Sequence, residues 1–174
     1  LKDCPIKVGD KIASLVSLSL TPLKIEKITK IYPDIDRVEI VGQAILFESG
    51  LYAKLPEDMS ESLALAALDV AGAPAQAAKM IKPGQSVLIL GAGGKSGMLV
   101  AYEAMKRVGP TGRVVGNVYL ADDKKTLNDL ELCHEVVVAD ASKPVPFLQS
   151  VLEANHGKEY DLVVNCVNVP NTEM

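Results

Sequence analysis

Cysteine and histidine are scarce in this sequence, and both scarcities limit the chemistry that it can carry. The three cysteines, Cys4, Cys133 and Cys166, are far apart and odd in number, which fits neither a disulfide framework nor a zinc site of paired cysteines. The two histidines, His134 and His156, do not stand at helical spacing from another metal-type ligand. We therefore expect no metal site, a reducing compartment, and cysteines that act as small apolar side chains.

Long apolar runs and basic clusters are also missing. No apolar run reaches the roughly 18 to 20 residues that a membrane-spanning helix needs, and no basic stretch leads into an apolar one at the amino terminus. The 18 basic residues are scattered over a chain with a formal net charge of -4, so nothing attracts a polyanionic backbone. We expect a cytoplasmic protein that binds neither membranes nor nucleic acid.

The sequence does contain enough apolar residues for a packed core, at 48% of 174 residues. Residues 1–62 read as short strands that are separated by turn signals, among them Gly42, and we assign them to part of a mostly-β domain. The strands expected there are Lys11 to Leu20, Leu23 to Ile31, Arg37 to Val41 and Ala44 to Phe47.

The pattern changes after Pro56, where Ser60 can cap a helix whose apolar surface extends from Leu63 to Ala71. Four apolar strands joined by three helices then predict a parallel sheet with right-handed crossovers. We assign residues 63–174 to a Rossmann-like, doubly wound α/β domain. The expected strands are Val87 to Leu90, Arg113 to Leu120, Glu135 to Ala139 and Asp161 to Val167, and the expected helices are Ser96 to Val108, Asp123 to Leu132 and Pro144 to Ala154.

A glycine-rich turn connects the first of these strands with its helix. Such a turn combines unpaired backbone N–H groups with the positive end of the helix dipole, and glycines let a diphosphate approach closely. In the usual dinucleotide motif, Gly91 and Gly93 would be the first two glycines, but Ser96 stands at the position of the third. Gly91, Gly94 and Gly97 form a second possible set, with a glycine at every third position. The turn predicts a dinucleotide site, for which the expected cofactor-binding residues are Gly91, Ala92, Gly93, Gly94, Lys95, Ser96 and Gly97.

Other interpretations of this turn stay open. A glycine-rich turn without any ligand is one of them. Gly94-Lys95-Ser96 also resembles the end of a nucleoside-triphosphate loop, but that motif requires a glycine at the position of Ile89. Lys95 either contacts the diphosphate or is solvated at the start of the helix.

An acidic residue that binds the adenosine ribose is the second feature expected of such a site, at the end of the second strand. Val118 stands at the expected distance, and the first acidic residues, Asp122 and Asp123, follow later. Asp122 either reaches the ribose from the loop or caps a helix. Lys124 and Lys125 could bind the 2′-phosphate of NADP, but the adjacent carboxylates oppose it, so we expect NAD, with NADP as the alternative.

Three further side chains are candidates for the site. Asn165 and Asn168 follow the fourth strand, at the sheet edge where doubly wound folds bind ligands; solvation of a loop explains them almost as well. Asp69 is a carboxylate in an otherwise apolar segment and is a candidate for contact with the substrate. Its alternative roles are a helix cap or a buried structural ion pair.

Four segments resemble the medium-chain, alcohol-dehydrogenase-like oxidoreductases. Lys82 to Gly94 resembles the lead-in to the cofactor domain of that family, and Asp161 to Val167 resembles its fourth cofactor-domain strand. Lys7 to Ile12 resembles a turn of its GroES-like catalytic domain, and Lys54 to Pro56 resembles the crossover between the two domains. The resemblance implies that residues 1–62 are part of a GroES-like catalytic domain.

Other segments indicate which members of that family the chain resembles. Ala13 to Pro22 has no cysteine, unlike the cysteine-rich lobe of zinc alcohol dehydrogenases, so no structural zinc is expected there. Leu18 to Ile28, Gly42 to Gly50 and Asp69 to Gln76 are similar to the 3,5-diaminohexanoate dehydrogenases of lysine fermentation. This resemblance implies oxidative deamination of a small amino acid, L-erythro-3,5-diaminohexanoate, to 5-amino-3-oxohexanoate and ammonia. A nearby base must keep the reacting amine neutral, and the sequence does not identify it.

Two other functions stay open: a related alcohol or quinone oxidoreductase, and a nucleotide-binding module without chemistry. If the resemblance holds, parts of both domains lie outside these residues, and we expect no catalysis by these residues alone. A homo-oligomer is also expected, although the residues carry no signal of its size.

Overall fold

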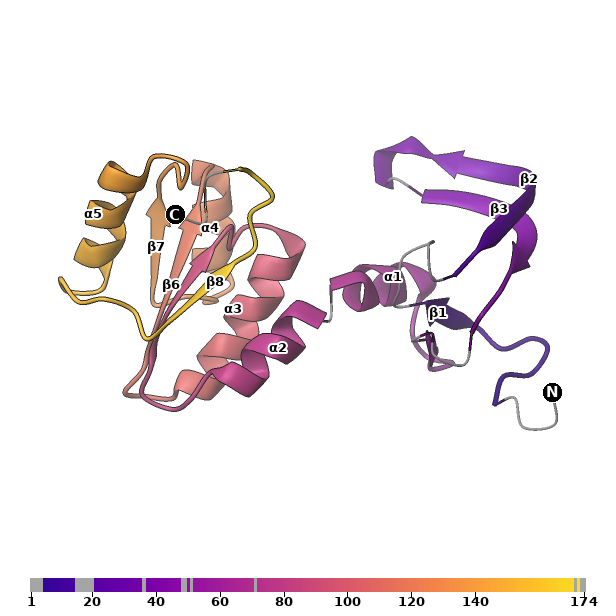
Figure 1. Ribbon diagram of the computed structural model, residues 1–174, viewed down its shortest axis with the longest axis horizontal. Helices are drawn as coiled ribbons and strands as arrows, with labels where there is room; N and C mark the ends of the chain where they lie inside the picture. The colour runs from indigo at the N-terminus through magenta and orange to yellow at the C-terminus, as the bar shows by residue number, and fades with distance from the viewer. Residues whose placement is uncertain are drawn as a thin grey trace. The chain divides into compact units, whose positions relative to one another are not determined.

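The structure is a computed structural model that describes residues 5–14, 21–35, 37–47, 50, 52–70, 72–170 and 172. The chain divides into two compact units, residues 1–69 and residues 70–174 (Figure 1). Within the described ranges, no helix is both long and apolar enough to cross a membrane.

Antiparallel strands make up most of the first unit. β1 pairs with β4, and β2 pairs with β3 to form a hairpin. The helix expected after Ser60 is confirmed, and the Leu63 N–H donates a hydrogen bond of 3.3 Å to the Ser60 Oγ. The elements are β1 (Ile12–Ser14), β2 (Leu23–Tyr32), the 3-10 helix η1 (Pro33–Ile35), β3 (Arg37–Ala44), β4 (Tyr52–Lys54) and α1 (Glu61–Val70).

Two strand predictions in this unit are wrong. Gly42 is not a turn but lies within β3, opposite Ile25, and residues 45–47 are not a strand. A Cβ added at Gly42 would collide with the carbonyl oxygen of Lys24, so this glycine allows close pairing of the two strands. β4 was not predicted, because three residues are too few to show an alternating pattern.

The strand expected from Lys11 to Leu20 is confirmed in part. β1 lies in its first half, and residues 15–20 lie outside the described residues.

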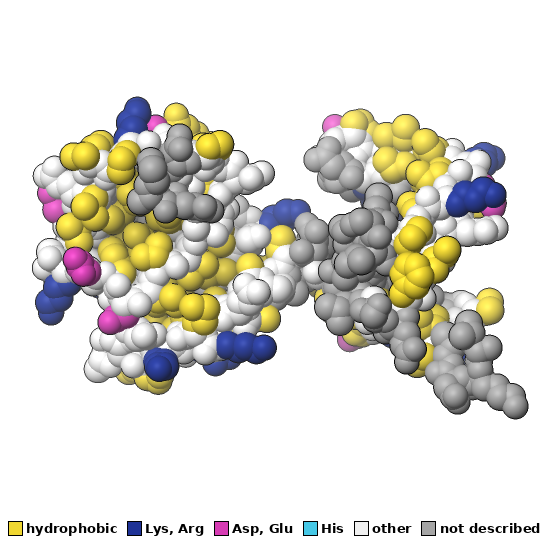
Figure 2. Space-filling model, viewed as in Figure 1, with side chains coloured by type: hydrophobic (Ala, Val, Ile, Leu, Met, Phe, Trp, Pro, Cys, Tyr) yellow, Lys and Arg dark blue, Asp and Glu magenta, His cyan; other side chains and the backbone are white. Residues whose placement is uncertain are grey.

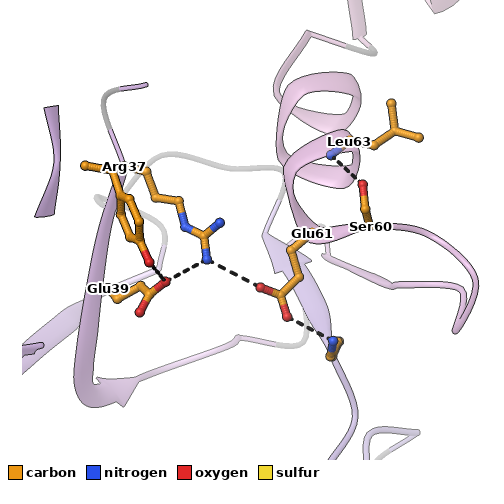
Figure 3. Close-up of polar contacts among 7 residues, drawn as sticks. Arg37, Glu39, Ser60, Glu61 and Leu63 are labelled. Atoms are coloured by element: carbon orange, nitrogen blue, oxygen red, sulfur yellow. Dashed lines mark hydrogen bonds and ion pairs between the residues drawn. The ribbon is translucent and has the colours of Figure 1, made fainter. Parts of the chain in front are cut away.

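A polar network connects β2, β3 and α1 with Lys11, the residue before β1 (Figure 3). The Arg37 guanidinium lies 2.8 Å from a Glu39 carboxylate oxygen and 3.6 Å from a Glu61 oxygen, and the Tyr32 hydroxyl donates to Glu39 at 2.9 Å. Lys11 lies 2.9 Å from Glu61, and this hydrogen bond holds the pKa of the Glu61 carboxyl below its ordinary value. Exposed ion pairs contribute little to stability, so the network adds little to the folding of this unit.

The second unit contains a four-stranded parallel sheet in the order β7-β6-β5-β8, with helices between successive strands. The predicted doubly wound α/β fold is confirmed, and the structure adds α2, which the sequence analysis did not identify. The elements are α2 (Gly72–Met80), β5 (Ser86–Leu90), α3 (Lys95–Val108), β6 (Arg113–Val118), α4 (Ala121–Asp129), β7 (Glu135–Val138), α5 (Pro144–Ala154) and β8 (Leu162–Asn165).

Alternating side chains of β5 build a core on each face of this sheet. Val87 and Ile89 are fully buried and pack in a cluster with side chains from α2, α3 and α4. Leu88 and Leu90 point to the opposite face and pack with Val151 of α5. Each such buried side chain contributes roughly 1.5–3 kcal/mol, so the apolar part of β5, from Val87 to Leu90, is stable only between two helical layers (Figure 1).

Cys133 packs in the core, and His134 takes part in a backbone hydrogen bond. The Cys133 thiol packs in the core and lies 2.8 Å from the position of a Cβ added at Gly116, and burial raises its pKa to about 12. Burial also raises the pKa of Cys166. The Val114 N–H donates to the His134 Nδ1 at 2.9 Å, and burial lowers the pKa of this imidazole. Cys4 lies outside the described residues, and among the described ones no group of three His, Cys, Asp or Glu could hold a metal ion.

Candidate functional site

A hollow of about 500 Å³ lies at the carboxyl edge of the parallel sheet. The carboxyl ends of parallel strands share one edge, so the segments after all four strands contribute to its lining. The lining residues are Gly91, Gly93 and Gly94 after β5, Asn117, Val118, Tyr119 and Asp123 around the end of β6, Ala139, Asp140, Ala141 and Ser142 after β7, and Cys166, Val167, Val169 and Thr172 from the end of β8 onward.

Three glycines of the turn have different neighbours. Gly91 has a φ of 71°, and a Cβ there would lie 2.8 Å from the Val167 side chain. A Cβ at Gly97 would collide with the carbonyl oxygen of Gly91 and lie 2.7 Å from the Cα of Ala92, so Gly97 permits the close packing of α3 on the turn. Gly93 faces the hollow. Gly91 thus makes the tight turn, Gly93 lines the hollow in contact with the Asp123 side chain, and Gly97 allows close packing. This combination differs from both registers considered from the sequence.

The start of α3 is built to attract an anion. The helix follows Gly94, whose extended backbone provides no side chain to cap it. Its first residues are Lys95, Ser96 and Gly97, and their backbone N–H groups stand at the positive end of the helix dipole. Ala92 is fully buried beneath the turn, and its N–H donates to the Asn117 carbonyl at 2.8 Å. The turn is therefore anchored to β6 while Gly91, Gly93 and Gly94 line the hollow, an arrangement that fits a diphosphate.

Asn117 holds the opposite wall of the hollow in place. Its side chain is buried, and its Nδ2 donates to the carbonyl oxygen of Ala139 at 2.9 Å and of Val137 at 3.4 Å. The amide therefore joins the end of β6 to the loop after β7. Asn117 is not among the site residues predicted from the sequence; the signal for it is a lone amide in a strand that has no other polar side chain after Arg113.

The loop after β7 is ordered by Asp140. Its carboxylate accepts hydrogen bonds from the Ser142 hydroxyl at 2.6 Å and from the Ser142 N–H at 3.0 Å, and these bonds hold the pKa of Asp140 below its ordinary value. Lys143 lies 3.4 Å from the same carboxylate. The negative charge of Asp140 is thus already engaged within its own loop.

The two adjacent aspartates of α4 have different positions. Asp122 is exposed and does not line the hollow, whereas Asp123 is half-buried and does. A Cβ added at Gly93 would lie 2.7 Å from the Asp123 Cγ and 2.8 Å from its Oδ2, so this carboxylate rests against the glycine turn. Val118, at the strand end where a ribose-binding acid is expected, is buried.

The remaining predicted site residues lie outside the lining. Asn165 is exposed, accepts a hydrogen bond from the Val167 N–H at 2.9 Å and donates to the Thr172 Oγ1 at 3.3 Å, so it shapes the loop after β8. Asn168 is exposed in that loop. Asp69 belongs to α1, and its side chain is outside what the structure describes. The structure therefore brings together the glycine turn and the start of α4, but not the two asparagines.

A second hollow, of about 630 Å³, lies on the α5 face of the sheet. Its lining is mostly apolar and includes Leu88, Phe147, Leu148 and Val163. Figure 2 shows hydrophobic side chains gathered on this part of the surface. Because it lacks an arrangement of anion-binding groups, we place the candidate site at the glycine turn.

Comparison with known proteins identifies the relatives of this chain. Residues 1–56 match the family model of the L-erythro-3,5-diaminohexanoate dehydrogenase N-terminal domain. The chain is 68% identical to the L-erythro-3,5-diaminohexanoate dehydrogenase of Acetoanaerobium sticklandii and 66% identical to that of Fusobacterium nucleatum, in each case over 97% of this chain and 49% of the relative. The chain thus spans about half the length of these curated relatives.

Solved structures agree on the fold. A quinone oxidoreductase of Pseudomonas syringae superposes on 92% of this chain and 42% of its own, with a TM-score of 0.60 and 19% identity. A mycobacterial protein in complex with NADPH superposes on 65% of this chain and 34% of its own, with a TM-score of 0.53 and 25% identity. The predicted fold of the medium-chain oxidoreductases is thereby confirmed. The resemblance to the 3,5-diaminohexanoate dehydrogenases that the sequence motifs indicate is confirmed over almost the whole of this chain.

Proposed function

We propose that this chain carries the cofactor-binding unit of an NAD-dependent dehydrogenase that oxidatively deaminates L-erythro-3,5-diaminohexanoate. The observation that carries the proposal is the open glycine turn at the start of α3, in a chain that is 66–68% identical to dehydrogenases named for this substrate. A glycine turn alone supports only a nucleotide site. The identity of the substrate is therefore inferred from the names of the relatives.

The residues of this chain have binding and orienting roles in the reaction. The N–H groups at the start of α3 would hold the cofactor diphosphate, and Gly94, whose nearest neighbour for an added Cβ is 3.7 Å away, would leave room for it. When bound, the nicotinamide supplies a hydride acceptor. Asn117 and Asp140 would keep the opposite wall in place and so limit the positions that the cofactor can take.

The overall reaction balances with water as the second substrate. The carbon that bears the 3-amino group loses a hydride, and water then hydrolyses the resulting substrate imine to a ketone and ammonia. The amine can release hydride only with its lone pair free, so a protonated amine must first lose a proton. We expect the rate to rise with pH up to the pKa of that amine in the complex.

The test uses the intact protein and follows the formation of NADH from L-erythro-3,5-diaminohexanoate, with simple alcohols as competing substrates. Gly94→Val should abolish cofactor binding in calorimetry, because a Cβ at Gly94 meets no atom closer than 3.7 Å and its side chain would occupy open space beside the start of α3. Gly72→Ala is the matched control, since a Cβ at Gly72 meets nothing within 4 Å.

Three outcomes would contradict the proposal. Turnover of alcohols but not of the diamine would favour the alcohol oxidoreductase. Cofactor binding without turnover of any substrate would favour a non-catalytic module. Failure of the intact, folded protein to bind either nicotinamide cofactor would reject the dinucleotide site itself.

A further inference from the structure

The β2–β3 hairpin has one wholly apolar face. Ile28 lies opposite Ile40 in the pairing of the two strands, and Ile31 lies opposite Val38. Directly paired residues of an antiparallel ribbon point to the same face, and every second residue of a strand shares that face. The residues that form this aliphatic face are Leu23, Ile25, Ile28 and Ile31 of β2 with Val38, Ile40, Gly42 and Ala44 of β3.

The aliphatic face is exposed to solvent. Its largest exposed side chains retain 40–61% of their accessible surface, and they are Leu23, Ile25, Ile28, Ile31 and Val38. A two-stranded hairpin is at best marginally stable in water unless its apolar face packs against another layer. A contiguous apolar patch of this kind marks an interaction surface in a soluble protein. The hairpin therefore requires a partner on this face.

The helix α1 contacts the hairpin from the opposite side. Tyr32 is paired with Arg37, and both point to the other face of the ribbon together with Glu39. From that polar face, Arg37 lies 3.6 Å from a carboxylate oxygen of Glu61 in α1 (Figure 3). This contact engages the polar face and leaves the aliphatic face open.

The chemistry of the aliphatic face favours a copy of itself as the partner. All eight of its residues are apolar, so the face offers nothing to a charged partner, whereas an uncharged face can pack against its own copy about a two-fold axis. Lys24, Lys27 and Lys30 are paired with residues of the opposite face and point away from such a contact. Two copies can therefore meet without bringing like charges together.

The size of the aliphatic face reaches the minimum for a contact between copies. A side-chain carbon presents about 30 Å² when fully exposed, and the large side chains of this face are about half exposed. One copy therefore offers roughly 300–350 Å² of apolar surface, and two copies offer roughly 650 Å². Because homodimer interfaces are about 65% apolar, the whole contact would bury about 1,000 Å², the lower limit for a specific interface.

We propose that the aliphatic face of the β2–β3 hairpin is a homodimer interface, in which it packs against the same face of a second copy about a two-fold axis. The two ribbons lie face to face at about the 10 Å spacing of packed sheets, with Ile28 near the middle of the contact. No residue of the hairpin lines the hollow at the glycine turn, so this interface is independent of the proposed function.

Sedimentation equilibrium of the intact protein measures its self-association. The unmodified protein should form a dimer or a larger even-numbered assembly. Ile28→Glu should weaken self-association on the order of a hundredfold or more, because the two-fold axis would place two unpaired carboxylates in an apolar contact. Val41→Glu is the matched control, since Val41 is 52% exposed, close to the 53% of Ile28, but pairs with Lys27 on the opposite face. It should leave self-association unchanged.

Ile31→Glu provides a second variant if Ile28→Glu folds poorly, as judged by its melting temperature. A monomeric unmodified protein would overturn the inference. So would unchanged self-association in the folded variants of the aliphatic face, and a lowered melting temperature in those variants would then identify another part of the same polypeptide as the partner of this face. Equal weakening by Val41→Glu would also overturn it, because added charge would then matter and its position would not.

Discussion

Glycines in the same turn should respond differently to the same substitution. In Gly97→Ala the added Cβ would meet the backbone of Gly91 and Ala92, which cannot move without displacing α3 from β5. We expect the free energy of unfolding to fall by about 1–3 kcal/mol. In Gly94→Ala the nearest atom is 3.7 Å away, an ordinary contact, so a smaller loss is expected. Urea denaturation of both variants tests this, and equal losses would contradict the packing role of Gly97.

Asp161 should make stability depend on pH. Its carboxylate accepts hydrogen bonds from the Ser86 N–H at 2.7 Å and the Ser86 hydroxyl at 2.9 Å, which lower its pKa and join the starts of β5 and β8. A lowered folded-state pKa means that the stabilisation is present above the unfolded pKa and is lost as the pH falls through the folded pKa.

In Asp161→Asn the loss of stability between about pH 5 and pH 2 should therefore be smaller than in the unmodified protein. Urea denaturation across this pH range measures it. Asp129→Asn, on the exposed surface of α4, should keep the original pH profile. An unchanged profile in Asp161→Asn would show that these hydrogen bonds do not favour the charged carboxylate.

The difference between Asp122 and Asp123 could not be read from the sequence. The helix was expected to begin at Asp123, but α4 begins at Ala121, so both aspartates lie in its first turn. Successive residues of an α-helix point about 100° apart, so the start of the helix decides which carboxylate faces the glycine turn. The sequence therefore predicts an acidic residue near the site but not which one lines it.

At the scale of elements, the parallel sheet was predictable because its strands are apolar runs between helical patterns. The β2–β3 hairpin was harder to predict. Ile25, Ile28 and Ile31 are three residues apart, a spacing that a regular strand would place on alternating faces. The pairing of β2 with β3 is irregular at two places, and as a result the three isoleucines lie opposite every second residue of β3. Every second residue of a strand points to the same face, so the three isoleucines share one face. Such irregularities have no clear sequence signal, and the position of Gly42 within β3 depends on the same pairing.

Asn117 should stabilise the contact between β6 and the loop after β7. Asn117→Leu keeps the approximate size of the side chain but removes its Nδ2 donor, leaving the carbonyl of Ala139 without its 2.9 Å partner. We expect the free energy of unfolding to fall by about 1 kcal/mol, the usual net contribution of a hydrogen bond, because Ala139 is only partly buried. Urea denaturation measures this loss, and calorimetry should show weaker cofactor binding. A variant with unchanged stability would show that the amide is dispensable.

Across the whole molecule, the two units differ sharply in their cores. Among the described residues of the first unit, Ala13 and Ala64 are the buried hydrophobic ones, whereas the second unit buries hydrophobic side chains on both faces of its sheet. In the hairpin, Ile25 and Ile31 are 53% and 61% exposed. Since burial of apolar surface is the main favourable contribution to folding, the first unit by itself should be much less stable.

Limited proteolysis of the purified 174-residue chain tests this difference. A protease of broad specificity should cut first within residues 1–69 and leave a resistant product that contains residues 70–174, because cleavage requires local opening and the second unit opens at a higher free-energy cost. Mass spectrometry would identify the product. NAD should slow cleavage of the second unit alone, since a ligand protects the unit that binds it. Early cleavage within α3 or β6 would contradict the expected order and show that the sheet is not the more stable part.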